Sequence, residues 1–229
     1  NIREIGHCAD VTGAVGINIR DNLAYVICFR RSLSVVDISD PANPELVGEW
    51  RSGGMHQAID GFRIEFRGNY LFTGFGDEDF YLAVFDISNP VRPEVMFRWD
   101  EIRYSDFCIV GDVAFMMGRV GDETFYSVSI LDIENLQVIA TYHANYLGGT
   151  IHYSNNRIYN HSDAIKIFNV SDPEHIEEIS RVRRGVPPPG RAPVSLMGNF
   201  VIGSYDEWGL LIADFSRLRD PELLHFELN

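Results

Sequence analysis

The 229-residue sequence is poor in positive charge. Lys+Arg total 19 against 33 Asp+Glu, which gives a net charge of −14, and Lys166 is the only lysine. A protein whose main partner is nucleic acid or an anionic membrane needs a basic face. The composition therefore predicts neither partner, although a local cluster of arginines could still bind an anion.

The sequence also lacks a hydrophobic run of about 18 residues, the length that a membrane-spanning helix requires. Residues 1–10 carry no charged-then-apolar leader. Membrane insertion is therefore not expected, and the sequence favours neither an exported nor a cytoplasmic location. With 45% hydrophobic residues, the chain is too apolar for disorder and long enough to bury a core as one domain.

Cysteine is scarce, and Cys8, Cys28 and Cys108 are widely separated. Three such residues are too few for a disulfide framework, and they form no CxxC motif. The histidines show no HxH or HxxxH pair, and the acidic loops lack the spacing of a calcium loop. We therefore expect no metal and no cofactor.

Helical periodicity is missing from every stretch of ten residues, and an internal repeat takes its place. Each copy contains short apolar strands, then Asp-Ile-Ser or a variant of it, and in most copies a proline-containing turn follows. The marker residues of the copies are Asp37, Asp86, Asp132, Asn169 and Asp214. We expect each marker to cap its own turn. Four strands per copy at this period are typical of the blades of a β-propeller.

The repeat resembles a known family over most of the chain, strongly in the first two copies, moderately in the fourth and fifth, and poorly in the third. The segments VVDISDPANPELVG, residues 35–48, and VFDISNPVRPEV, residues 84–95, are similar to the LVIVD repeat of bacterial and archaeal proteins. This resemblance implies a propeller fold but no activity, because function depends on sites rather than on folds. We expect an all-β, five-bladed β-propeller of four-stranded blades in one domain. The expected blades are residues 11–50, 57–99, 104–142, 149–183 and 192–229.

The opening segment, residues 1–10, resembles the fourth strand of a blade and has no three strands before it. We expect it to lie beside the last blade as a closing strand that ties the ends of the ring together. The alternative is that the chain is part of a larger propeller.

The first strand of each blade of a propeller lines a central channel. Apolar side chains two and four residues before the following turn, such as Ile19 and Ile17, are expected to pack between blades. Side chains three and five residues before the turn point the other way because strand side chains alternate. The candidate site residues at these positions are Asn18, Glu65, Cys108, His152, Ser195, Arg63 and Asp106.

This mixture of polar groups favours a small-molecule site at the channel mouth. Glu65 and His152 are suited to proton transfer, because burial and neighbours tune carboxyl and imidazole groups toward neutral pH. Cys108 is a candidate nucleophile if a neighbour lowers the pKa of its thiol. Arg63 would either hold a ligand carboxylate or pair with Asp106. The candidate ligand-binding residues are Arg63, Asp106, Asn18, Ser195, His56 and His143.

Two functions stay open at this point. The first is binding of a small polar or anionic organic molecule, with or without cofactor-independent acid/base catalysis of the lyase, isomerase, cyclase or hydrolase type. The second is a non-catalytic interaction module of an exported or surface protein. In that module the polar channel groups satisfy one another through water. The sequence does not indicate an oligomeric state.

Overall fold

The chain folds into β-strands joined by turns. The structure, a computed structural model, describes residues 3–29, 32–51, 63–75, 81–99, 102–120, 126–135, 137–144, 150–161, 164–183, 194–205 and 209–226. Over these ranges the regular elements are all strands, so the all-β expectation is confirmed. None of the described segments is a helix long and apolar enough to cross a membrane.

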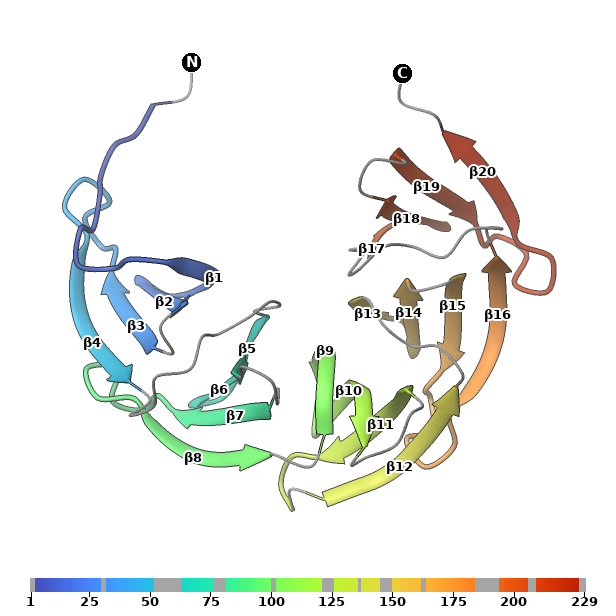
Figure 1. Cartoon of the computed structure of the whole chain (residues 1–229), viewed down its shortest axis with the longest axis horizontal. Coiled ribbons are helices and arrows are strands. Elements are labelled where there is room, and N and C mark those ends of the chain that lie inside the picture. Colours follow the sequence, from blue (N-terminus) through green and yellow to red (C-terminus); the bar gives the residue numbers. More distant parts are fainter. Residues whose placement is uncertain are drawn as a thin grey trace. The chain divides into compact units, whose positions relative to one another are not determined.

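Twenty strands form five antiparallel four-stranded sheets in chain order (Figure 1). Sheet 1 contains β1 (Ala14–Arg20), β2 (Leu23–Cys28), β3 (Ser32–Asp37) and β4 (Glu45–Arg51). Sheet 2 contains β5 (Ile64–Arg67), β6 (Tyr70–Phe75), β7 (Tyr81–Asp86) and β8 (Glu94–Trp99). Sheet 3 contains β9 (Ile102–Val110), β10 (Val113–Val120), β11 (Tyr126–Asp132) and β12 (Gln137–Ala144).

The last two sheets repeat the same plan. Sheet 4 contains β13 (Thr150–Ser154), β14 (Arg157–His161), β15 (Ala164–Asn169) and β16 (Glu177–Arg183). Sheet 5 contains β17 (Val194–Met197), β18 (Phe200–Tyr205), β19 (Gly209–Asp214) and β20 (Glu222–Phe226). In every sheet the first strand is one edge and the fourth strand is the other. We call these the inner and the outer strand.

Residue contacts divide the chain into two compact units, Asn1–Arg103 and Tyr104–Asn229. The first unit contains sheets 1 and 2. The second contains sheets 3 to 5, apart from the first two residues of β9. Each unit is described by itself.

A two-residue turn joins the inner strand of each sheet to the second strand. Its first residue has a left-handed backbone conformation, with φ between 52° and 61°. These residues are Asp21, Gly68, Gly111, Asn155 and Gly198. Glycine, Asn and Asp adopt this conformation at lower cost than other residues, and tight hairpins require it.

The marker residue of the repeat closes the turn between the third and the outer strand. The carboxylate of Asp37 accepts the backbone N–H of Ser39 at 2.8 Å, and Asp86 accepts that of Ser88 at 2.8 Å. The same bond is made by Asp132, Asn169 and Asp214. These backbone bonds hold the pKa of the Asp37 and Asp86 carboxyls below their ordinary value. The expected capping role is confirmed.

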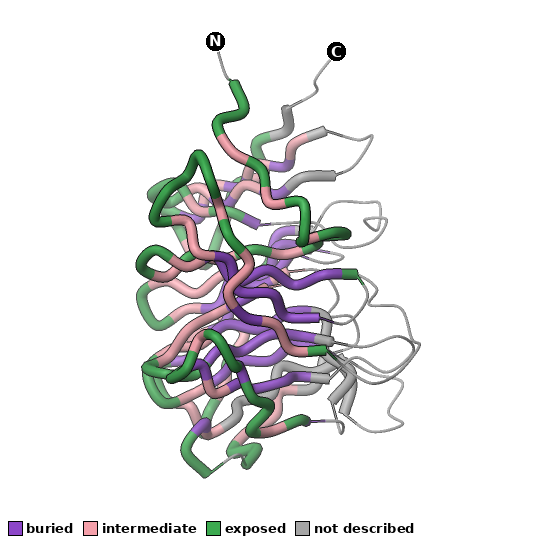
Figure 2. Tube along the Cα trace, turned by 90° about the vertical axis from the view of Figure 1, so that its left-hand side faces the viewer, coloured by how far each residue is buried: buried purple, intermediate pink, exposed green. Residues whose placement is uncertain are grey.

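Within each unit the core lies between consecutive sheets, and Figure 2 shows the buried residues in the strands and the exposed ones mostly in the turns. We call the face that a sheet turns to the next sheet its leading face, and the opposite one its trailing face. In the first unit, the leading face of sheet 1 contributes Tyr25, Ile27, Leu33 and Val35. The trailing face of sheet 2 contributes Ile64, Leu71, Ala83 and Phe85. Similar clusters join sheet 3 to sheet 4 and sheet 4 to sheet 5.

Aromatic pairs recur at these junctions. Trp50 on β4 meets Phe85 on β7 edge to face, with ring centroids 5.0 Å apart. Tyr142 on β12 meets Phe168 on β15 in the same way at 5.3 Å. A second pair joins inner and second strands, Tyr25 with Phe66 at 5.1 Å and Phe115 with Tyr153 at 5.9 Å. The repeat therefore places equivalent contacts at junctions in both units.

The trailing face of sheet 1 departs from this pattern. Ile17 and Ile19 on β1 are 63% and 55% exposed, whereas Ile64, at the place of Ile17 in sheet 2, is 4% exposed. Within the first unit, Ile17 and Ile19 do not pack on another sheet as Ile64 does. In this unit, the described residues place no sheet against this side of β1.

Candidate functional site

The seven inner-strand residues that the sequence suggested are divided between the two units. Asn18, Arg63 and Glu65 belong to the first, and Asp106, Cys108, His152 and Ser195 to the second. Glu65 and His152, the expected proton-transfer pair, are thus in different units. His56 lies outside the described residues, and so does the side chain of His143, whose backbone belongs to β12.

Arg63 and Glu65 come together at the inner strand of sheet 2. The Nε atom of Arg63 lies 3.5 Å from the Oε1 atom of Glu65, and the two side chains are 31% and 24% exposed. Glu65 lies on β5 and Arg63 directly precedes that strand, and residues two apart in an extended segment point to the same side. An ion pair that is largely but not fully buried keeps a polar group at this edge without a large effect on stability.

Asn18 links the inner strands of sheets 1 and 2. Its Nδ2 atom donates to the carbonyl oxygen of Ile64 at 2.7 Å, and its Oδ1 atom accepts the N–H of Ile19 at 2.9 Å. The amide therefore joins β1 to β5 rather than being held open for a ligand.

Asp106 makes the corresponding link in the second unit. It is 9% exposed, and its Oδ2 atom accepts the backbone N–H of Ile151 on β13 at 2.8 Å. Its Oδ1 atom accepts the N–H of Phe107 at 3.0 Å. Ile151 and Ile64 both lie four residues before their turns, so the two units fasten equivalent points of neighbouring inner strands.

Cys108 lies in an apolar cluster, contrary to the expectation that it points away from the apolar positions. It is 5% exposed and packs with Phe115 of its own sheet and Ile151 of the next. Asn18, at the same place in the repeat, also reaches the next inner strand. Side chains at this place thus point toward the following sheet, and a buried thiol serves there as a small apolar group.

His152 and Ser195 occupy the inner strands of sheets 4 and 5. His152 on β13 is partly buried and lies opposite Tyr159 in the register. Ser195 on β17 is exposed and lies opposite Ile202. The described residues contain no cluster of three or more His, Cys, Asp or Glu side chains that could hold a metal ion.

A polar hollow in the first unit was not foreseen from the sequence. It has a volume of about 150 Å³ and is lined by Asp10, Thr12, Cys28, Ser32, Ser34, Glu49 and Arg51. Arg51 Nε donates to Glu49 Oε2 at 2.7 Å, and the Cys28 sulfur lies 3.8 Å from the Ser34 hydroxyl. The alternation of Ser32, Leu33 and Ser34 on a buried strand was the signal that could have indicated it.

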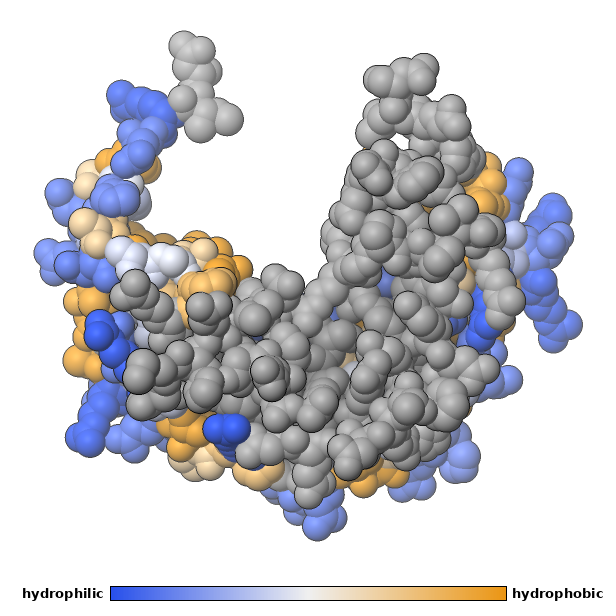
Figure 3. Space-filling model, in the orientation of Figure 1, coloured by the Kyte–Doolittle hydropathy of each residue, from blue (hydrophilic) through white to orange (hydrophobic). Residues whose placement is uncertain are grey.

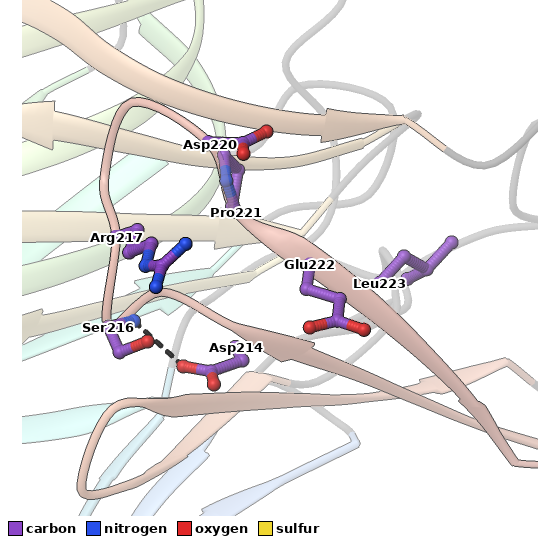
Figure 4. A pocket seen from close by; sticks show the side chains of 7 residues that line it. All are labelled: Asp214, Ser216, Arg217, Asp220, Pro221, Glu222 and Leu223. Atoms are coloured by element: carbon purple, nitrogen blue, oxygen red, sulfur yellow. Dashed lines mark hydrogen bonds between the residues drawn. The ribbon is translucent and has the colours of Figure 1, made fainter.

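A second hollow, of about 560 Å³, lies at the turn between β19 and β20 (Figure 4). Asp214, which lines it, accepts the backbone N–H of Ser216 at 2.7 Å and is the marker residue of its repeat. The carboxylate is thus engaged in capping the turn. Neither hollow is lined by a site residue that the sequence suggested.

Comparisons with solved structures match the fold. The chain is similar to BamB from Moraxella catarrhalis, a propeller-like protein, at 8% identity and a TM-score of 0.62, over 92% of this chain and 64% of that one. It is similar to a hypothetical selenium-binding protein from Sulfolobus tokodaii at 12% identity and a TM-score of 0.63, over 88% of this chain and 58% of that one. It is similar to the computationally designed protein Ika8 at 11% identity and a TM-score of 0.62, over 91% of this chain and 59% of that one. At such low identity the likeness concerns the fold alone.

The chain spans 58% to 64% of the length of these three structures. No curated protein matches it in sequence. The family model of the LVIVD repeat matches residues 13–51 and 62–101, the segments that form sheets 1 and 2. The resemblance found in the sequence is therefore confirmed for these two segments, which match the LVIVD repeat.

Proposed function

We propose that this chain is a β-propeller interaction module rather than an enzyme. The observation that carries the proposal is the use of the inner-strand polar groups. Asn18 and Asp106 bond the backbone of the neighbouring inner strand, and Cys108 is buried among apolar side chains. Three of the seven expected site residues thus hold sheets together, which is what a structural propeller requires.

The proposal also agrees with how propellers are built. In a propeller, neighbouring sheets bury the faces between them, and the chemistry of any function lies on the edges and turns that remain. In this chain exposed apolar side chains lie on the outer strands, including Met96 on β8, Ile139 on β12 and Leu224 on β20. Such side chains suit contact with another protein when they gather into a patch.

A small polar or anionic ligand is the second candidate, and the Arg63–Glu65 pair favours it. The pair is partly exposed on an inner strand, and an arginine fork matches a carboxylate or phosphate. The pair would hold the anion in the first unit, and Glu65 is the group of this pair that the sequence predicts for proton transfer. Acid/base catalysis stays a prediction from the sequence.

The experiment compares thermal unfolding of the wild type with that of Glu65→Gln and His152→Ala, with and without millimolar acetate, succinate or phosphate. The interaction module predicts that none of these anions raises the midpoint in any of the three proteins. A midpoint that rises with anion concentration in the wild type, and not in Glu65→Gln, would establish the small-ligand site instead.

The closed ring of five blades also stays a prediction. One observation weighs against closure by residues 1–10 as a strand of the last blade. Sheet 5 already has its outer strand, because β20 pairs with β19 from Leu210 to Asp214. The further alternative, membership of a larger propeller, leads to the inference below.

A further inference from the structure

The trailing face of sheet 1 is built like the trailing face of sheet 2, which packs on another sheet. In sheet 2 the inner strand places Ile64 in the core and Phe66 against Tyr25. In sheet 1 the same two places hold Ile17 and Ile19, and both are exposed. Figure 3 shows the hydrophobic residues at the surface where Figure 1 places β1. An apolar strand surface of this kind is costly unless something covers it.

The segment that precedes β1 covers only part of this face. Cys8 and Val11 pack against a buried cluster of Ala24, Val26, Cys28 and Val36. This contact protects the second and third strands of sheet 1. The isoleucines of the inner strand lie beyond it and stay exposed.

Gly6 identifies the place that this segment takes. A Cβ atom on Gly48 of the outer strand β4 would overlap the carbonyl oxygen of Pro90, in the turn of the next repeat. A Cβ atom on Gly6 would overlap the carbonyl oxygen of Pro41, in the turn of sheet 1. Pro41 and Pro90 are equivalent in the repeat. Gly6 therefore packs on sheet 1 as Gly48 packs on sheet 2.

Cys8 gives a second and independent match. It follows Gly6 by two residues, as Trp50 follows Gly48. Trp50 packs on Phe85 of sheet 2, and Cys8 belongs to the cluster that contains Val36, the residue of sheet 1 equivalent to Phe85. Residues 3–8 thus lie on sheet 1 as an outer strand of a preceding sheet would.

This outer strand has no sheet among the described residues. Residues 3–8 pair with no other strand there. Each of the five sheets already has its own outer strand, since β4, β8, β12, β16 and β20 all pair with their third strands. None of the described sheets therefore offers a free third strand to residues 3–8.

We propose that the trailing face of sheet 1 is the docking surface for one further sheet of the same repeat, whose three inner strands come from outside these 229 residues and whose outer strand is residues 3–8. The partner adds its third strand to the backbone of residues 3–8 by antiparallel hydrogen bonds. It lays an apolar leading face on Ile17 and Ile19. The surface accepts this partner whether or not the chain also binds a small molecule.

The leading faces within this chain define the chemistry of the partner. The second and third strands of sheet 1 present Tyr25, Ile27, Leu33 and Val35 to sheet 2. A partner of the same repeat presents an aromatic and three aliphatic side chains at these places. The aromatic residue falls on Ile19, as Tyr25 falls on Phe66.

The test joins the chain to three strands of its own kind. Residues 12–44, which contain β1 to β3 and the turn after them, are fused directly before Arg3 of the chain, in place of residues 1–2. This fusion gives residues 3–8 the spacing that residues 45–50 have after their own third strand. Ile17 of the original chain, not of the added segment, is replaced by cysteine. The rate at which a soluble thiol reagent labels this cysteine is measured by peptide mapping in the fused and the unfused chain.

The proposal predicts that fusion slows labelling of the Ile17→Cys thiol at least about tenfold and slows hydrogen exchange of the amides of residues 3–8. Gly6→Val in the fusion restores fast labelling, because its side chain overlaps the Pro41 carbonyl. His7→Val, which places the same valine side chain at the exposed neighbouring residue, leaves the protection intact.

Two results would overturn the proposal. Labelling as fast in the fusion as in the unfused chain would mean that the face does not accept such a sheet. Slow labelling in the unfused chain would also overturn it, because the face would then be covered already, by a second copy if the mass in solution is dimeric and by a sheet of the same chain if it is monomeric. The anion experiment on Glu65→Gln is independent of both, so each proposal fails separately.

Discussion

Sheets 1 and 2 have the same strand order, the same capped turns and the same repeat, yet their trailing faces differ. Ile64 in sheet 2 is 4% exposed, and Ile17 at the same place in sheet 1 is 63% exposed. The strands that carry them pair in equivalent ways with their second strands. The difference therefore comes from the neighbour and not from the sheet.

This comparison shows how a repeat fold divides its stability. Each sheet contributes two half-interfaces, and a half-interface stabilises the chain only when another sheet meets it. The trailing face of sheet 2 is stabilised in this way by packing on sheet 1 through the cluster around Ile64 and Phe85. The inner strand of sheet 1 has the same apolar side chains without the gain from burying them.

The largest expected difference comes from shortening the two equivalent isoleucines. Ile64→Ala removes core contacts and should lower the free energy of unfolding of the first unit by about 2–5 kcal/mol. Ile17→Ala removes an exposed side chain and should change it by less than about 0.5 kcal/mol. Urea unfolding of both variants measures the difference. Equal losses would show that Ile17 is buried in solution.

The two glycines give the next largest contrast. Gly48→Ala forces a methyl group against the Pro90 carbonyl between two complete sheets, and overpacking of this kind costs about 1–3 kcal/mol. Gly6→Ala creates the same overlap with Pro41, but residues 3–8 can detach without opening a sheet. We expect Gly6→Ala to leave the urea midpoint nearly unchanged and to speed hydrogen exchange at residues 3–8. A large loss of stability in Gly6→Ala would show that the segment belongs to the cooperative core.

The third largest expected effect comes from removing the side chains that hydrogen-bond one inner strand to the next. Asp106→Ala leaves the buried N–H of Ile151 without its carboxylate and should cost about 1–3 kcal/mol in the second unit. Asn18→Ala leaves the carbonyl of Ile64 without its amide and should cost about 1 kcal/mol in the first. Thermal unfolding of both variants, with Ser195→Ala as the control at an exposed inner-strand position, measures these effects. Losses no greater than that of Ser195→Ala would remove the structural role of the two side chains.

The smallest effect is the pH dependence of the turns, and here sheets 1 and 2 should behave alike. Backbone N–H donors lower the pKa of Asp37 and Asp86 in the folded chain. Their contribution is therefore present above the unfolded pKa of about 3.9 and is lost as the pH falls through the folded value. Asp37→Asn and Asp86→Asn should each weaken the fall in the urea midpoint on acidification. A pH dependence that neither substitution changes would contradict the capping.

Most of the fold could be predicted from the sequence because turn-forming residues mark the ends of the strands in each copy of the repeat. The marker residues and the Gly, Asn or Asp residues of the tight turns fixed the strand boundaries, since few other residues tolerate those conformations. The LVIVD resemblance in residues 35–48 and 84–95 agreed with them. The structure confirmed the all-β, four-stranded sheets, the turns and the caps.

The candidate site was predicted less well from the sequence. The alternation of side chains along a strand predicts which face a side chain lies on, but not which residue of another strand it contacts. Cys108 and Asn18 point toward the next inner strand, and this contact turns expected channel residues into structural ones. Lys166, conspicuous in the sequence as the only lysine, is 1% exposed on β15 and adds no charge to the surface. The open face at Ile17 could not be foreseen, since its sequence is that of a covered strand.

The most direct test of the central claim is to compare thiol labelling of Ile17→Cys and Ile64→Cys in the unfused chain under native conditions. The difference between the sheets predicts that the thiol at position 17 reacts at nearly the rate of an unfolded peptide. It also predicts that the thiol at position 64 reacts at least about a hundredfold more slowly, through opening of the core. Equal rates at the two positions would contradict the account.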